Sequence, residues 1–327
     1  MRHQSRRIAV YNHKGGVGKT TLTINIAYAL KCAGKRVLMV DSDPQCNLTS
    51  YVVEDEVVDA LLDDSDKPDG VTLWSALKPV VEATGTAKSI PAIETSGLRL
   101  LPGDIRLSEY ESILDGFWTD CFSRKVRGFR GTGSLSQLVD TLARKHLADF
   151  VFYDAGPNIG PLNRAILLDC DYFIVPAACD LFSVRALKTL GHTLVEWIRQ
   201  WTEMSKLAPD DTYLLPGKPK FLGYLPQQFR VYGQSMTRDH SFYLSQLERR
   251  IQSDIVSPLR ELDRALIGVN LGAAKLGEVR DFGVLVELAQ KQGVPLARAK
   301  GGNAQLQRAA KTVFDQIAKK IIARAER

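Results

Sequence analysis

Short apolar runs rich in β-branched residues alternate along the chain with stretches of helical period. Residues 8–11 form the first run, and apolar positions 22, 26, 29 and 30 behind it recur with the spacing of one helix face. Further runs lie at residues 36–40, 97–103, 149–154, 172–176 and 220–226. Strands alternating with helices favour a three-layer α/β fold, in which helices cover both faces of a twisted, mostly parallel sheet.

Composition narrows the class of protein. The chain has 327 residues, 45% hydrophobic and 24% charged, and this globular balance excludes a disordered chain, a collagen and a coiled-coil rod. The net charge of +6 permits a polyanionic partner without requiring one. The 5 cysteines include no C-x-x-C pair, which argues against a zinc or iron–sulfur site and favours a reducing cytoplasm. No apolar stretch approaches the ~20 residues of a membrane span.

The clearest chemical signal is the segment HKGGVGKTT at residues 13–21, between a predicted strand and a predicted helix. Glycines let main-chain N–H groups curl around an anion, and the helix adds its unpaired amides and the positive end of its dipole. Lys19 would reach the terminal phosphates of a nucleotide, Thr20 would bind Mg²⁺, and Thr21 would donate to an inner phosphate. The predicted nucleotide-binding loop comprises Lys14, Gly15, Gly16, Val17, Gly18, Lys19, Thr20 and Thr21.

Carboxylates follow two of the predicted strands. Asp41 and Asp43 come after the run at 36–40, and on an extended segment they point to opposite sides, so we expect different roles for them. Asp154 ends the run at 149–154, at the edge where open α/β sheets bind ligands, and would hold Mg²⁺ through a water molecule. From residue types alone, Asp43 is equally compatible with a solvated turn. An aspartate at the end of a strand, such as Asp154, is often a helix cap as well.

The segment KGGVGKT at 14–20 resembles the deviant Walker A motif of the ParA/MinD family of partition and positioning ATPases. His13 stands where the standard Walker A motif has glycine, and Lys14 matches the signature lysine of the family. Residues 40–47 resemble the VDxDPQGN switch segment of the family, except that Cys46 replaces its glycine. The resemblance is tight over residues 6–50 and 149–190 and diffuse over 215–325.

The resemblance implies one P-loop NTPase domain over residues 1–327 that hydrolyses ATP with Mg²⁺. In the family, the counterpart of Lys14 crosses the interface of an ATP-bound sandwich dimer to the partner's phosphates, and that of Asp43 orients the attacking water. Asp41 would lie near Mg²⁺. A second cation suits phosphoryl transfer, because charge spreads over the peripheral oxygens. Hydrolysis in the family is slow and times the binding of the dimer and of a partner protein that stimulates it. By residue type alone, Lys14 also fits a solvated loop.

Outside these motifs the resemblance is weaker. Gln227 and Asp281 fall where relatives contact adenine, and both are also compatible with surface or capping residues. Residues 51–96 and 104–148 are expected insertions, and the first contains an acidic segment at 54–70. The second contains a basic segment that would neutralise DNA phosphates without reading sequence, or pair with the acidic segment. Its cations, interleaved with Phe129, are Arg124, Lys125, Arg127 and Arg130.

An apolar stripe within residues 300–327 predicts a C-terminal core helix. A membrane-surface helix is disfavoured, because its end lacks the expected Trp or Phe anchors. Our main hypothesis is a cytoplasmic ATPase switch for partition or positioning of DNA or another cargo. The long insertions motivate an alternative, a regulatory or assembly subunit of a larger complex. A reductase of the nitrogenase iron-protein type would need cluster cysteines, and the contexts of Cys121, Cys170 and Cys179 do not match.

Overall fold

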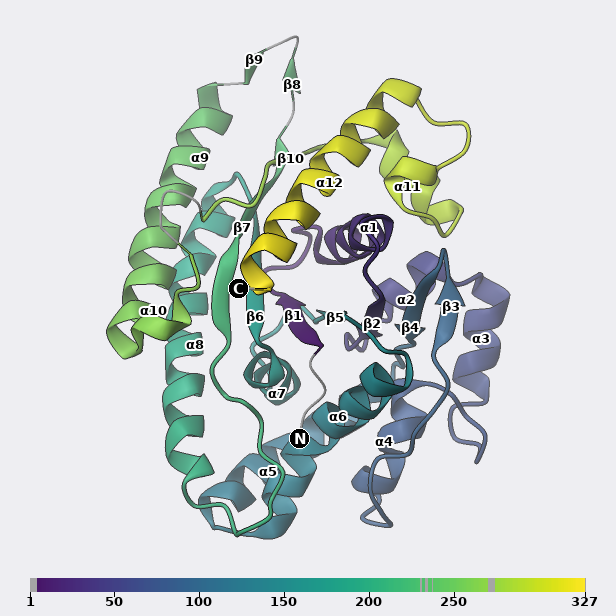
Figure 1. The fold of residues 1–327 in the computed structure, drawn as a ribbon, viewed down its shortest axis with the longest axis vertical. Helices are drawn as coiled ribbons and strands as arrows, with labels where there is room; N and C mark the ends of the chain where they lie inside the picture. The colour runs from purple at the N-terminus through teal and green to yellow at the C-terminus, as the bar shows by residue number, and fades with distance from the viewer. Residues whose placement is uncertain (1–4, 230, 233–234, 237, 270–273, 327) are drawn as a thin grey trace.

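The fold is built around one eight-stranded sheet (Figure 1). The computed structural model describes residues 5–229, 231–232, 235–236, 238–269 and 274–326. The strand order is β10-β7-β6-β1-β5-β2-β4-β3, and only β3 runs antiparallel to its neighbour. The strands are β1 (Arg6–Val10), β2 (Val37–Asp41), β3 (Ile93–Thr95), β4 (Leu98–Leu101), β5 (Phe150–Asp154), β6 (Tyr172–Ala178), β7 (Lys220–Phe229) and β10 (Val279–Arg280). A separate pair is β8 (Val231–Tyr232) with β9 (Ser235–Met236).

Helices cover both faces of this sheet (Figure 1). One face carries α4 (Leu73–Val81), α5 (Leu107–Phe122), α6 (Val126–Lys145), α7 (Pro161–Asp169), α8 (Leu181–Ser205), α9 (Arg238–Arg250), a π-helix (Ile251–Val256) and α10 (Ser257–Leu262). The other face carries α1 (Lys19–Cys32), α2 (Asn47–Val52), α11 (Val284–Lys291) and α12 (Ala304–Ala325). The predicted three-layer α/β fold is therefore confirmed.

Successive side chains of each strand point to opposite faces of the sheet and contribute to two hydrophobic cores, one on each face. In β5, Phe150 and Phe152 pack in the core under α1, whereas Val151 and Tyr153 pack in the core under α7. A central parallel strand buried on both faces has no place for a solvated polar side chain. Polar groups therefore gather just beyond the strands, and the nucleotide motifs all lie at their carboxyl ends.

A buried arginine fixes the start of β1. The guanidinium of Arg7, fully buried, donates to Asp169 of α7 at 2.7 Å, to Asp140 of α6 at 3.1 Å and to Ser136 Oγ at 2.9 Å. Burial alone would lower the pKa of Arg7, but Asp169, Tyr153 and Tyr213 together outweigh it and the pKa is raised. Removing one partner of such a network would leave an uncompensated buried charge, so it anchors the strand that leads into the phosphate loop.

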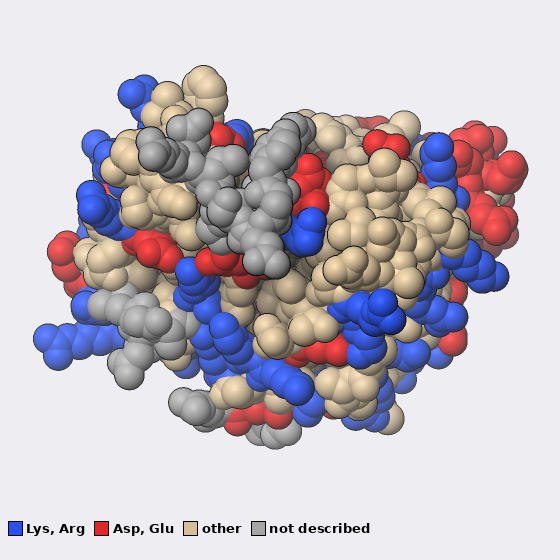
Figure 2. Space-filling view, turned by 90° about the horizontal axis from the view of Figure 1, so that it is seen from above, with Lys and Arg blue, Asp and Glu red and all other residues tan. Residues whose placement is uncertain are grey.

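The segments expected to be insertions carry their own elements. Residues 51–96 contain α3 (Asp55–Asp63), α4 and β3, and residues 104–148 contain α5 and α6. The acidic side chains of 54–70 are exposed on and around α3, and Figure 2 shows acidic groups gathered at that end of the molecule. The structure thus presents this segment to solvent.

The C-terminal segment forms α12, which packs along α1. Phe314, Ile317 and Ile321 are buried in the core that α1 also lines. Within the described ranges, none of the helices combines the length and the apolar character that crossing a membrane would need.

Candidate nucleotide site

The phosphate loop connects β1 to α1. Gly16 and Gly18 have φ angles of 71° and 75°, which residues with a Cβ rarely adopt. Helix α1 begins at Lys19, and within the described residues its first turn has neither a side-chain cap nor an acidic residue. Its amides are therefore open to an anion, as the sequence predicts.

Lys19 lies inside this loop and is 8% exposed. Burial lowers its pKa, although Asp154 and Asp43 act in the opposite direction. Its Nζ lies 3.4 Å from the carbonyl oxygen of Lys14. A lysine that is buried with so little compensation fits a place where an anion normally supplies the counter-charge.

Thr20 and Asp154 meet across the loop. The Thr20 hydroxyl donates to Asp154 Oδ2 at 2.7 Å. Asp154 is 1% exposed, and its Oδ1 has no hydrogen-bond partner within the described part of the chain. Burial, with a further contribution from Asp41, raises the pKa of Asp154 to about 8. A half-buried hydroxyl beside a buried carboxylate oxygen without a partner in the described ranges is a donor set that fits Mg²⁺, which takes oxygen ligands and keeps several of its waters.

Asp41 lies at the end of β2 in a buried hydrogen-bond network with Thr49. It lies opposite Asp154 in the register of β2 and β5. Its Oδ2 accepts the Thr49 backbone N–H at 2.7 Å and the Thr49 hydroxyl at 2.6 Å, while Thr49 Oγ1 accepts the Gly103 N–H at 2.8 Å. Burial raises the pKa of Asp41 to about 7. Asp41 thus ties α2 and the end of β4 to β2.

Asp43 lies beside the loop that follows β5. Its Oδ1 accepts the Gln45 N–H at 3.0 Å, and the side chain is 5% exposed. A Cβ on Gly156 would lie 3.2 Å from the same oxygen, so the glycine lets the loop at 155–160 approach the carboxylate closely. The structure brings Asp43, Asp154, Lys19 and Thr20 to one edge of the sheet.

Lys14 is held by the start of α8. Its Nζ donates to both carboxylate oxygens of Asp180, at 2.9 and 2.7 Å, and to Ser183 Oγ at 2.9 Å. Asp180 also caps α8 by accepting the Ser183 N–H at 2.8 Å. Lys14 is therefore anchored within its own chain in this state. Its partner Asp180 carries no motif that would have indicated the contact.

Sequence reasoning also missed Glu111, which comes from α5. Its Oε1 accepts a hydrogen bond from Asn158 Nδ2 at 3.3 Å. Burial raises the pKa of Glu111, and the nearby backbone N–H of Leu162 acts in the opposite direction. Tyr11 lies between β1 and the phosphate loop, and its hydroxyl donates a hydrogen bond to the Asn158 carbonyl at 2.7 Å. The loop at 155–160 is thus held between the phosphate loop and a helix in which no sequence motif marks a functional residue.

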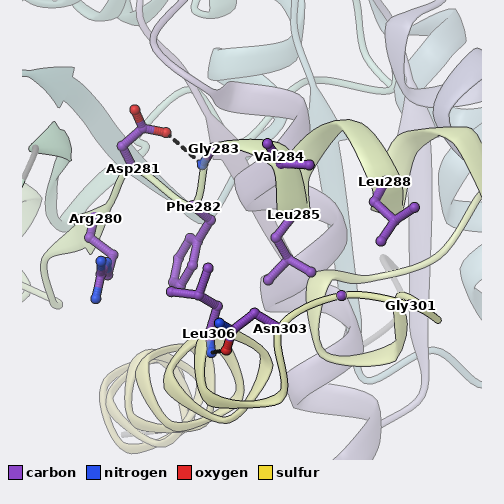
Figure 3. Close-up of a pocket in the computed structure, with 11 residues that line it drawn as sticks. Arg280, Asp281, Phe282, Gly283, Val284, Leu285, Leu288, Gly301, Asn303 and Leu306 are labelled. Atoms are coloured by element: carbon purple, nitrogen blue, oxygen red, sulfur yellow. Dashed lines mark hydrogen bonds between the residues drawn. The ribbon is translucent and has the colours of Figure 1, made fainter.

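Gln227 and Asp281 lie in different settings. Gln227 is 4% exposed, its Nε2 has no partner among the described residues, and its Oε1 would lie 2.7 Å from a Cβ on Gly18. Asp281 is exposed and accepts the Gly283 N–H at 2.8 Å, which favours a capping role. It borders a cavity of 510 Å³ that Phe282, Leu285 and Leu306 also line (Figure 3).

The basic segment lies at the turn between α5 and α6, and all four of its cations are exposed. Lys125 and Arg127 pair with Asp120, at 2.8 and 3.2 Å, rather than with the acidic segment of the same chain. Phe129, which lies between these cations in the sequence, is fully buried and does not contribute to this surface. The helical period of α6 places Phe129 in the core instead.

Several known proteins are similar to this chain in sequence. The family model described as AAA domain matches residues 5–207. The sporulation initiation inhibitor protein Soj of Bacillus subtilis (strain 168) is 31% identical over 193 residues, which are 57% of this chain and 64% of Soj. The chromosome partitioning protein ParA of Myxococcus xanthus (strain DK1622) is 28% identical over 195 residues, 58% of each chain. The chain thus spans somewhat less than two thirds of these relatives.

A solved structure extends the likeness to the whole chain. Protein DIP2308 from Corynebacterium diphtheriae is similar over 97% of both chains, with a TM-score of 0.72 and 26% sequence identity. The family model covers more than half of this chain, and it includes the phosphate loop, Asp43, Asp154 and Lys14. The chain therefore belongs to the AAA domain family and is a ParA/MinD-like P-loop ATPase.

Proposed function

We propose that this protein is a Mg²⁺-dependent ATPase whose ATP-bound form is a sandwich homodimer, and whose slow hydrolysis times the partition or positioning of DNA or another cargo. The observation that carries the proposal is the meeting of Lys19, Thr20 and Asp154 at the amino end of α1. These groups, with the open amides of the loop, suit a triphosphate and its metal.

Each polar group has a role in this proposal. The loop amides and Lys19 bind the β- and γ-phosphates, and Thr21 donates to the α-phosphate. Thr20 and Asp154 would hold Mg²⁺, directly or through water, and the bound ion supplies neutralisation of phosphate charge. Asp41 supports them from its buried position behind Asp154. Asp43 accepts a hydrogen bond from the water that attacks the γ-phosphate.

The adenine base has a candidate place beyond the phosphates. Gln227 lies against Gly18 and pairs in register with Val279 of β10, after which the chain enters the cavity at Asp281. An apolar cavity with few polar groups suits a purine ring. We assign the base to this cavity, with the unpartnered Nε2 of Gln227 as a hydrogen-bond donor to the nucleotide.

The same edge of the sheet offers a surface for a second copy. Ile159, Leu181 and Phe182 are 44%, 43% and 72% exposed, and they follow the carboxyl ends of β5 and β6. Exposed apolar residues around a nucleotide site favour a partner that covers it. Lys14 lies at the same edge of the sheet, where it is bonded to Asp180. Release from Asp180 would let Lys14 reach phosphates across the interface.

Lys14→Ala should lose ATP-driven dimerisation. Without a cation on the partner's phosphates, we expect the dimer to weaken by at least about 10-fold, while ATP binding by the monomer changes less. Sedimentation with and without ATP and Mg²⁺ measures both states. Ser183→Ala is the matched control, since it removes one cis contact but keeps Lys14. A Lys14→Ala dimer as tight as the native one would contradict action in trans.

ATP-dependent, sequence-independent DNA binding separates partition from the alternative of a regulatory or assembly subunit. The partition role requires DNA affinity at low salt to rise with ATP and to fall steeply as salt increases. Unchanged affinity upon ATP addition would favour the alternative.

The basic segment can be tested in the same assay. Arg124 and Arg130 are exposed and form no ion pair with any described residue. Replacing both by alanine should reduce the slope of log affinity against log salt by about 2. Replacing Lys67 and Lys88, two exposed lysines on either side of α4 in the sequence, is the control. An unaltered slope would place the DNA contact elsewhere.

A further inference from the structure

The carboxylate of Glu111 occupies a junction between three parts of the molecule. It belongs to α5, within the segment 104–148, yet it contacts the loop that follows β5 and the first turn of α7. Helix α7 begins at Pro161. Its N-cap residue is Gly160, and no described side chain within its own cap hydrogen-bonds to the first turn. The Leu162 N–H there opposes the rise that burial causes in the pKa of Glu111, so this carboxylate from a distant helix acts electrostatically on the start of α7.

Gly160 has no side chain and therefore leaves space for the carboxylate of Glu111. Its backbone has φ of −113°, which any residue adopts, so its conformation does not require glycine. A Cβ at this position would overlap Glu111 Oε1. The space left by Gly160 is therefore occupied by Glu111, and filling it would expel the carboxylate.

The groups around Glu111 connect it to the reaction centre. Asn158 donates to Glu111 through its side chain and accepts from Tyr11 through its carbonyl. Gly156, in the same loop, lies against Asp43. Burial raises the pKa of Glu111, and the charge of Asp43 raises it further, which places the two carboxylates within electrostatic reach. The contacts thus run from α5 through the loop at 155–160 to Asp43.

We propose that Glu111 is a positioning residue for ATP hydrolysis. It holds the loop at 155–160 and the start of α7 in the geometry that places Asp43 and the loop around the γ-phosphate. It touches neither the nucleotide loop nor the metal-binding pair, so it acts through other groups. This inference rests on the proposed ATPase function and deepens it, because it gives the segment 104–148 a direct part in turnover.

Glu111→Ala should therefore lower kcat by about 10- to 100-fold, because small misplacements at a reaction centre have effects of this size. KM for ATP should stay within about twofold, because the phosphate loop is untouched. Glu111→Gln keeps an oxygen that can accept the hydrogen bond from Asn158 and should restore most of the rate. Glu109→Ala, on the same helix but exposed and paired with Arg106, is the matched control.

Gly160→Ala tests the same contact from the other side. It should reproduce the loss of kcat, and the double variant with Glu111→Ala should be no slower than either single one, as expected for two changes to one contact. Additive losses, full turnover by Glu111→Ala, or a loss of kcat that Glu111→Gln does not restore would each overturn the proposal.

An ATP-independent measurement distinguishes this inference from the proposed function. Exchange of the Arg164 amide, which donates to the Gly160 carbonyl at 3.0 Å at the start of α7, should be faster in Glu111→Ala than in the native protein. If native protein fails to hydrolyse ATP, the proposed function falls with it, and so does a role for Glu111 in turnover. If native protein hydrolyses ATP but the Arg164 amide is equally protected in both proteins, the positioning role alone is overturned.

Discussion

Lys19→Ala should abolish measurable ATP binding at micromolar protein. Lys19 is nearly buried in the loop, and its charge is poorly compensated there without a phosphate. A charge-assisted hydrogen bond contributes about 1.5–3 kcal/mol, and the ammonium would contact more than one phosphate oxygen. The combined loss corresponds to at least about 100-fold in affinity. Calorimetric titration with ATP and Mg²⁺ measures it directly.

The stability of the unliganded variant provides the control. The folded state lowers the pKa of Lys19, so a charged lysine at this position opposes folding at neutral pH. Lys19→Ala should therefore melt no lower than the native protein, which separates lost binding from lost fold. Lys67→Ala, at an exposed lysine, should bind ATP normally. Native affinity in Lys19→Ala would show that the loop at 13–21 does not bind the phosphates.

The nucleotide machinery was predictable because each of its parts is local in sequence. Glycines with positive φ, a lysine and a hydroxyl within one loop are specified by a strand before them and a helix after them. The contact between Thr20 and Asp154 spans 134 residues, yet strand pairing brings it about, because carboxyl ends of neighbouring parallel strands meet at one edge. Periodicity similarly placed α12 on the core.

The contacts that were not predicted depend on packing between elements. Asp180 follows β6 and meets Lys14 only because β6 lies beside β1. Glu111 reaches the loop at 155–160 because α5 packs against α7, and no spacing within α5 indicates this. Asp41 is buried at the end of its strand, and the hydrogen bonds that it accepts from Thr49 depend on how α2 packs there. Charge runs were the least informative pattern, since they do not distinguish an exposed face from a helix that buries Phe129.

Asp43→Ala should bind ATP but fail to cleave it. General-base and water-orienting groups contribute about 10²- to 10⁴-fold to rate, and we expect kcat to fall within that range. Lys19, Thr20 and Asp154 are unchanged in this variant, so affinity for ATP with Mg²⁺ should remain near native. Because hydrolysis would normally end the dimeric state, ATP should trap the variant as a persistent dimer. Phosphate release and sedimentation on one sample test both expectations.

Asp43→Asn separates the charge from the turn that Asp43 supports. Its amide oxygen can still accept the Gln45 N–H, so the segment after β2 keeps its hydrogen bond. If the carboxylate acts on the water, Asp43→Asn should be as slow as Asp43→Ala. Asp59→Asn, at an exposed carboxylate on α3, should turn over like the native protein. Normal turnover by Asp43→Asn would limit Asp43 to shaping the turn, and another group would then have to orient the water.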